Sequence, residues 1–148
     1  MKSQAEIQIK MVRSGAVPPR YGSGGAAGLD LAACLEEPLT VAPGARAMVP
    51  TGLAMALPSR LVALVFARSG LAARHGLALA NGVGVVDSDY RGEVICAMIN
   101  LAGDPYTIEP GDRIAQVVFV PVERARMVLT EDLPPSGRGE GGFGSTGR

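Results

Sequence analysis

The side chains most able to bind and cleave a small molecule lie in one segment, NGVGVVDSDYRGEV, which begins at Asn81. The Asn81 carboxamide can donate to and accept from the edge of a heterocyclic base. Asp87 can serve as a general base, and Tyr90 can offer a ring face to a ligand. An aspartate in a turn usually only bonds local backbone amides, so Asp87 is informative only together with its neighbours. We predict a β-hairpin here, with its carboxylates near the turn.

Small and polar residues also occupy unusual places in the expected strands. Gly82 and Gly84 would let the main chain approach a flat ligand closely. Asp30 in GLDL and Gln116 in GDRIAQVVF lie within apolar strands, where a polar side chain is costly unless it is paired. Each of these two polar residues, taken alone, is best explained as a satisfied structural group.

Arg68, Ser69 and Gly70 follow an apolar strand in the segment ARSGLAARHG. They place a guanidinium, a hydroxyl and a free backbone amide at one chain reversal, which is a suitable cradle for a polyphosphate. An ordinary polar turn would have the same composition, and the segment alone favours that simpler interpretation.

The last residues, 131–148, form a Gly-rich arm with little that could pack in a core. A simple flexible tail is the usual meaning of such a composition, and we expect disorder in free solution. Arg138 nevertheless offers a guanidinium fork to phosphate, and the glycines around Phe143, Gly144 and Ser145 can present amides to an anion. The letters GRGEGG match a dinucleotide-binding pattern, but no strand precedes them and no helix can follow them, so we dismiss that interpretation.

Composition favours one small all-β domain. The chain has 148 residues, of which 47% are hydrophobic but only 4% aromatic, and its 20 Gly and 11 Pro suit short strands joined by turns. A net charge of +0 excludes a basic footprint for duplex nucleic acid or for an anionic membrane. No apolar run approaches the ~18 residues of a membrane span, and the opening residues lack the apolar centre of a signal peptide, so we expect a cytoplasmic protein.

The two cysteines, Cys34 and Cys96, each lie inside an apolar run. We expect buried free thiols in a reducing compartment, with a disulfide as the alternative. The single histidine, His75, has no obvious partner for a zinc site.

Apolar runs of strand length recur, with Gly or Pro between them. We expect strands near 7–12, 29–33, 47–49, 53–57, 61–67, 77–80, 83–86, 94–101, 106–108, 114–120 and 126–129. Residues 59–80 compete as a helix, but Gly70 and Gly76 interrupt them, so at most one short helix after Ser69 fits better. The pattern predicts a jelly-roll-like barrel or sandwich over residues 1–130, followed by the arm.

Two of these segments, 93–101 and 113–122, are apolar on both faces. Strands of that kind are covered on both sides, so we expect either a second sheet or another subunit against each face.

Taken in order, five segments resemble the motifs of the trimeric dUTPase family: AAGLDLAA, ARSGLAARHG, NGVGVVDSDYRGE, GDRIAQVVF and RGEGGFGSTGR. The resemblance runs from about Ala26 to the end of the chain. It implies a β jelly roll that assembles as a homotrimer, with active sites shared between subunits. It also implies hydrolysis of dUTP at the α-phosphate to dUMP and pyrophosphate with Mg²⁺. That activity limits uracil incorporation into DNA and supplies dUMP for thymidylate synthesis.

The resemblance assigns a role to each candidate residue. Asp87 would activate the attacking water, and the ring of Tyr90 would leave no room for a 2′-hydroxyl. Uracil would be read by Asn81, Gly82 and Gly84. The phosphates would meet Arg68, Ser69, Gly70 and Gln116, and the closing arm would add Arg138, Phe143, Gly144 and Ser145. Asp30 would lie near the water shell of a Mg²⁺ ion held mainly by the substrate phosphates.

Two alternatives stay open. A dCTP deaminase resembles dUTPases in fold, but its catalytic glutamate would fall at Ala97, and VICAMINL holds no carboxylate. A non-catalytic jelly roll that binds nucleotides is the other alternative, and the presence of Asp87, Tyr90 and the arm argues against it.

Overall fold

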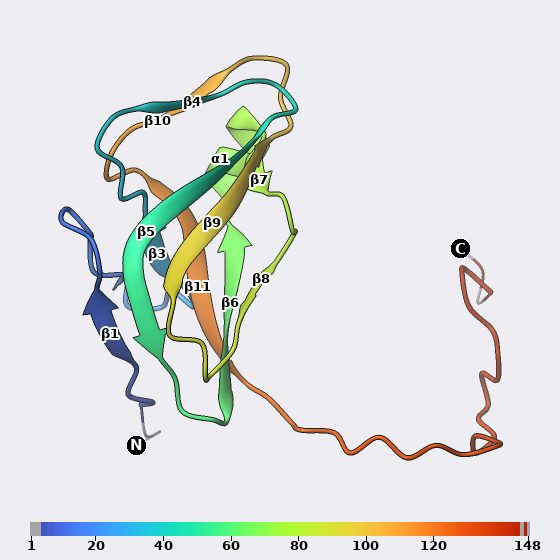
Figure 1. Ribbon diagram of the computed structural model, residues 1–148. Coiled ribbons are helices and arrows are strands. Elements are labelled where there is room, and N and C mark those ends of the chain that lie inside the picture. The colour runs from blue at the N-terminus through green and yellow to red at the C-terminus, as the bar shows by residue number, and fades with distance from the viewer. Residues whose placement is uncertain (1–3, 146, 148) are drawn as a thin grey trace.

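The computed structural model describes residues 4–145 and residue 147, and it has a nearly all-β body with one short helix (Figure 1). The strands are β1 (Gln8–Met11), β2 (Arg20–Tyr21), β3 (Leu29–Ala32), β4 (Leu39–Val41), β5 (Arg46–Ala56), β6 (Leu61–Ala67), β7 (Leu77–Leu79), β8 (Gly84–Val86), β9 (Glu93–Asn100), β10 (Tyr106–Ile108) and β11 (Arg113–Pro121), and the helix is α1 (Ser69–His75). The predictions of an all-β chain and of one short helix after Ser69 are confirmed.

Two antiparallel sheets form the body, one of order β1-β5-β9-β7 and the other of order β2-β3-β11-β6-β8. A two-stranded sheet of β10 and β4 lies across one end, at the top of Figure 1. The core between the sheets is aliphatic, as the low aromatic content requires. Its largest fully buried apolar side chains are Leu31, Leu53, Leu77, Met98, Ile108, Ile114, Val41, Val49 and Val117.

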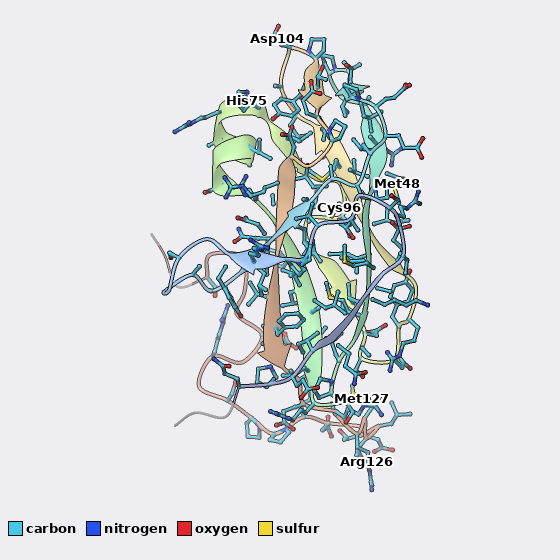
Figure 2. All side chains as sticks on the ribbon, turned by 90° about the vertical axis from the view of Figure 1, so that its left-hand side faces the viewer. Met48, His75, Cys96, Asp104, Arg126 and Met127 are labelled. Atoms are coloured by element: carbon cyan, nitrogen blue, oxygen red, sulfur yellow. The ribbon has the colours of Figure 1, made fainter. Side chains whose placement is uncertain are left out.

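The inner faces of β9 and β11 are buried, but their outer faces are only partly covered. In β9, Val94, Cys96 and Met98 point into the core, whereas Ile95 between them is exposed. Met48, on the neighbouring strand β5, is 65% exposed and lies on the outside of the body, while Cys96 lies inside it (Figure 2). Apolar surface therefore remains open on the outer side of this sheet in the single chain.

The predicted strand at 126–129 is wrong. After β11 the chain leaves the body as an extended arm without strand pairing among the described residues (Figure 1). Met127 and Leu129 are almost fully exposed there. Their apolar alternation resembles a strand, but a strand also needs a hydrogen-bonding neighbour, and the chain's own body offers none to this segment.

The other differences are local. Strands β2 and β4, of two and three residues, were not predicted. The two strands expected at 47–49 and 53–57 are one long strand, β5. Gly52, at φ +70°, forms a bulge there, and the register against β9 shifts between Pro50 and Ala54.

The predicted hairpin around Asp87 is also wrong in topology. β8 pairs with β6 in one sheet, whereas β9 pairs with β5 and β7 in the other. Residues 87–92 therefore cross between sheets instead of turning back within one.

Cys34 and Cys96 are both free thiols, as expected, but only Cys96 is buried, whereas Cys34 is partly exposed. Burial raises the pKa of the Cys96 thiol to about 12, so this group stays neutral at physiological pH.

The ring of His75 packs against Tyr106 with centroids 5.1 Å apart. Within residues 4–145, no helix has the length and apolarity needed to cross a membrane.

Gly76 ends α1 and supports a stability prediction. It adopts φ +66°, its N–H donates to the Ala72 carbonyl at 3.1 Å, and a Cβ would lie 2.5 Å from the backbone N of Ala102. Gly76→Ala should lower the free energy of unfolding by at least about 2 kcal/mol, because it adds both strain and a backbone overlap. Gly103→Ala is the matched control, since its Cβ would meet no atom within 4 Å. Urea unfolding compares the two variants, and equal stability would contradict this account.

Candidate functional site

A pocket with a volume of about 370 Å³ lies where the edge of one sheet meets the other. β8 forms one wall, and residues of β7 and β9 form the other. The candidate residues in its lining are Asn81, Gly84, Asp87 and Tyr90, joined by Glu93 and Ala97. The inter-sheet crossing therefore brings the carboxamide, the carboxylate and the phenol ring together in one concavity.

Tyr90 is held from two sides. Its hydroxyl donates to the backbone carbonyl of Glu93 at 3.0 Å, and the ring lies so close to Gly92 that a Cβ there would overlap it. The side chain is otherwise half-exposed, so a ligand can reach it. A flat aromatic surface thus lines the pocket in a defined orientation.

The carboxylate of Glu93 is bound by groups that come from distant parts of the chain. Arg13 Nε lies 2.7 Å from Glu93 Oε1, and Arg13 Nη2 donates to Oε2 at 2.9 Å. Oε1 also accepts the N–H of Gly52 at 2.9 Å. The hydrogen bond from Arg13 lowers the pKa of Glu93 below its ordinary value, against the opposing effect of burial. The same ion pair raises the pKa of Arg13.

A second cluster, which we call the arginine cluster, comprises Asp30, Arg68, Arg113 and Gln116. Asp30 on β3 lies 3.1 Å from Arg68 Nε and 3.0 Å from Arg113 Nη1. Arg68 also donates to the Arg113 carbonyl at 2.9 Å. Asp30 is costly inside an apolar strand unless it is paired, and here it is paired with two cations, as a satisfied structural group must be.

Gln116 lies opposite Asp30 in the register of β11 against β3. Its Nε2 donates to the Ala67 carbonyl at 3.0 Å, directly before Arg68. The pairing of β3, β11 and β6 thus places Gln116 and Arg68, two residues expected to contact phosphate, near each other on one sheet. Ser69 and Gly70 are exposed in the first turn of α1, where backbone N–H groups have no helical acceptor.

Within one chain, the candidates form two groups rather than one. The residues Arg68, Ser69, Gly70 and Gln116 do not line the pocket that holds Asp87.

The arm is a third, separate part, and it runs away from the body (Figure 1). Arg138 donates from Nε to the Gly141 carbonyl at 2.6 Å, and Phe143 is fully exposed at φ 49°. Gly144 and Ser145 follow it in a turn. The arm therefore does not close over its own pocket.

Three residues of these sites were not singled out from the sequence: Arg13, Glu93 and Arg113. The letters YRGE and GDRIAQ contain Glu93 and Arg113, but no local pattern tells which partner each will have. Arg13 lies 80 positions before Glu93, so only the fold shows that the two residues meet.

Fold and sites together define a small jelly-roll-like β protein with a pocket lined by an amide, a carboxylate and an aromatic ring, and with a separate cluster of two guanidinium groups around a carboxylate. A family model described as dUTPase matches residues 15–147, so the chain belongs to the dUTPase family. Curated relatives named deoxyuridine 5′-triphosphate nucleotidohydrolase are similar over most of their length. One from Desulfitobacterium hafniense is 54% identical over 145 residues, 96% of each chain. One from Anaeromyxobacter sp. is 57% identical over 130 residues, 88% of this chain and 87% of the relative.

Solved structures agree with the fold. The Staphylococcus bacteriophage 80alpha dUTPase with dUpNHpp matches with a TM-score of 0.88 and 26% identity, over 97% of this chain and 99% of that one. A dUTPase of the S. aureus phage phi11, described with a structural Mg(II) ion, matches with a TM-score of 0.80 and 22% identity, over 88% and 99%. These neighbours confirm the jelly-roll class predicted from the sequence.

The ion pair at Glu93 predicts a pH dependence of stability. Because the folded-state pKa of this carboxyl is depressed, its contribution is present above the unfolded value of about 4.3 and is lost as the pH falls through the folded value. Glu93→Gln should therefore destabilise the protein at pH 7 and matter progressively less as the pH falls below about 4.3. Denaturant unfolding at several pH values measures this. The exposed Glu37→Gln is the control, and a Glu93 variant with the same pH profile as wild type would contradict the assignment.

Proposed function

We propose that this protein is a dUTP diphosphatase, which hydrolyses dUTP at the α-phosphate to dUMP and pyrophosphate. The observation that carries the proposal is the single pocket that gathers Asn81, Asp87 and Tyr90 in a chain of the dUTPase family. The activity limits uracil incorporation into DNA and supplies dUMP for thymidylate synthesis. The free thiols of the protein, Cys34 and Cys96, suit a reducing compartment, and we propose a cytoplasmic location.

The base and sugar are bound on the pocket side. The Asn81 carboxamide and the main chain of Gly82 and Gly84 read uracil, and close main-chain packing leaves no room for the C5-methyl group of thymine. Tyr90 lies beneath deoxyribose and excludes the 2′-hydroxyl of a ribonucleotide. Support for this role comes from the restrained Tyr90 ring, which offers a fixed surface for the sugar.

Asp87 is the general base. It orients a water molecule and takes its proton while the water oxygen attacks the α-phosphorus in line with the departing pyrophosphate. The P–O bond to the bridging oxygen breaks, and the leaving group carries the displaced electron pair. The pocket lining supports such a role because it places this carboxylate beside apolar walls in the same concavity as Asn81 and Tyr90.

The arginine cluster and the arm bind the phosphates. Arg68, Ser69, Gly70 and Gln116 contact the triphosphate, and Arg138, Gly144 and Ser145 close over it while Phe143 stacks on the base. The ion pair with Asp30 holds the Arg68 guanidinium in one place before any ligand arrives. Because the Arg68 guanidinium is already oriented, it loses less conformational freedom when it binds a phosphate.

The donor set also fits Mg²⁺. The described residues contain no group of three or more His, Cys, Asp or Glu side chains that could hold a metal alone. Mg²⁺ prefers oxygen ligands, keeps several waters and is commonly held by substrate phosphates, so Asp30 would meet its water shell. When bound, the ion neutralises charge that develops on the leaving pyrophosphate.

The active form is a homotrimer with shared sites. The pocket and the arginine cluster are separate in one chain, the arm runs outward, and apolar surface such as Met48 and Ile95 stays open. A neighbouring body, residues 1–130, would complete each pocket, and an arm, residues 131–148, from another subunit would close it. Obligate interfaces are apolar in the same way as these open faces.

The first test is pyrophosphate release from dUTP, dTTP, dCTP and UTP in the presence of Mg²⁺. We expect turnover of dUTP and strong discrimination against the other three. Asp87→Asn should lower turnover roughly 10²–10⁴-fold with little effect on dUTP binding. Release of ammonia from dCTP would favour the deaminase, and binding of dUTP without turnover would favour a non-catalytic protein.

The second test separates the subunits' contributions. Deleting residues 139–148 should reduce turnover by at least roughly 10²-fold while the oligomer, measured by light scattering, stays intact. Mixed and reassembled with Asp87→Asn subunits, the truncated chains should recover part of the activity. Failure to complement would contradict a shared site, and loss of the oligomer on truncation would mean that the arm is structural.

A further inference from the structure

Glu93 lines the pocket, yet the proposed chemistry leaves it without a role. Its backbone carbonyl accepts the hydroxyl of Tyr90 at 3.0 Å, and its carboxylate is bound by Arg13. We propose that the Arg13–Glu93 ion pair is a positioning device, which sets the Tyr90 ring and thereby sharpens the discrimination between deoxyribose and ribose. This inference rests on the proposed function, in which Tyr90 senses the 2′-position.

The carbonyl that holds Tyr90 belongs to the first residue of β9, a position that frays unless something restrains it. Besides its ladder pairing with Ala54, three contacts restrain it here. Arg13 binds the Glu93 carboxylate through two nitrogens, the N–H of Gly52 donates to the same carboxylate at 2.9 Å, and Thr51 Oγ1 donates to the carbonyl of Val94 at 2.6 Å. The peptide between residues 93 and 94 therefore cannot turn freely, and the carbonyl keeps its direction toward Tyr90.

The residues that restrain Glu93 are also connected to the segment that follows β1. The N–H of Val12 donates to the Gly52 carbonyl at 2.8 Å, so the bulge in β5 is bound to the chain just before Arg13. A Cβ on Gly52 would lie 2.6 Å from the Cβ of Ala16, which shows how closely the same segment packs on the bulge, and 2.9 Å from the Sγ of Cys34, which follows β3. Arg13, Gly52 and Glu93 thus form one connected unit.

The Tyr90 backbone is held locally, by its N–H bond to the Asp87 carbonyl at 3.2 Å and by Arg91 Nη1, which donates to its carbonyl at 3.0 Å, but its side chain has few restraints. The side chain is 46% exposed, and its ring rests on the backbone of Gly92, the residue that precedes Glu93. A shift of the Glu93 backbone therefore moves both the acceptor of the Tyr90 hydroxyl and the surface on which the ring lies. A ring that excludes one hydroxyl group must be placed within a fraction of an ångström, because a small retreat would make room for it.

The ion pair is better suited to orientation than to global stability. The Arg13 side chain is 50% exposed, so solvent screens the pair and its contribution to the free energy of unfolding is modest, although the Glu93 carboxylate, 16% exposed, still gives that contribution a measurable pH dependence. The two-point contact of a guanidinium with a carboxylate nevertheless fixes the geometry of both groups. Loss of the pair should therefore affect substrate choice more than folding.

The experiment measures kcat/KM for dUTP and for UTP in wild type, Arg13→Gln and Glu93→Gln, well below the melting temperature of each. We expect the dUTP-to-UTP ratio to fall about tenfold in both variants, mainly through faster turnover of UTP. Arg13→Lys keeps the charge but not the two-point contact, so its ratio should lie between those of wild type and Arg13→Gln.

Lys10→Gln is the matched control. It removes one cation from β1, three residues before Arg13, and Lys10 makes no ion pair among residues 4–145. Its ratio should equal that of wild type. Arg13→Gln alters a half-exposed side chain and is expected to fold, so the comparison remains decisive even if Glu93→Gln is too unstable to assay.

The outcomes separate this inference from the function on which it rests. A wild type without dUTP turnover would contradict the proposed function, and a Tyr90→Ala variant that still rejects UTP would remove the basis for the ion pair's role. If wild type and Tyr90→Ala behave as expected, an unchanged ratio in Arg13→Gln overturns the inference. Equal losses for both substrates, which leave the ratio unchanged, would likewise show a purely structural ion pair.

Discussion

The site depends on one feature of the topology, the crossing of residues 87–92 from one sheet to the other. A hairpin would have held these residues by its own ladder of hydrogen bonds, but β8 and β9 pair with strands of different sheets. Asp87 and Tyr90 lie on a segment without such a ladder. A few local bonds, such as that from the Tyr90 N–H to the Asp87 carbonyl at 3.2 Å, hold its backbone, and contacts from outside the segment add to them. The contacts of Glu93 with Arg13 and Gly52 do so at the end where β9 begins. Bulges and strand ends near binding sites commonly serve this purpose.

The arginine cluster is organised differently, by strand register. Asp30 and Gln116 stand opposite each other on β3 and β11, and Gln116 reaches the end of β6 just before Arg68. A carboxylate between two guanidinium groups reduces the repulsion of clustered cations and fixes the direction of their side chains. The same arrangement would let an anionic ligand bind to groups that are already in place.

Several features of the chain are incomplete within one copy. The arm has no body to bind, Met48 and Ile95 face outward, and the pocket does not include the arginine cluster. Each alone has a simple explanation, such as a flexible terminus or scattered surface hydrophobes. Together they support the proposed assembly with shared sites, because one arrangement of subunits would satisfy all of them.

The sequence by itself determined the all-β class, the short helix after Ser69, most strands and the chemical character of the candidate residues. These follow from local composition, since alternation, glycines and polar residues in apolar runs are visible within a few positions. Only the tertiary structure decided that β8 and β9 lie in different sheets, that residues 126–129 form no strand in the chain's own body, and that Asp30 pairs with Arg68 and Arg113. It alone brought Arg13 to Glu93. Strand partners and ion pairs are contacts between distant segments, and local residue patterns carry no information on which segments meet.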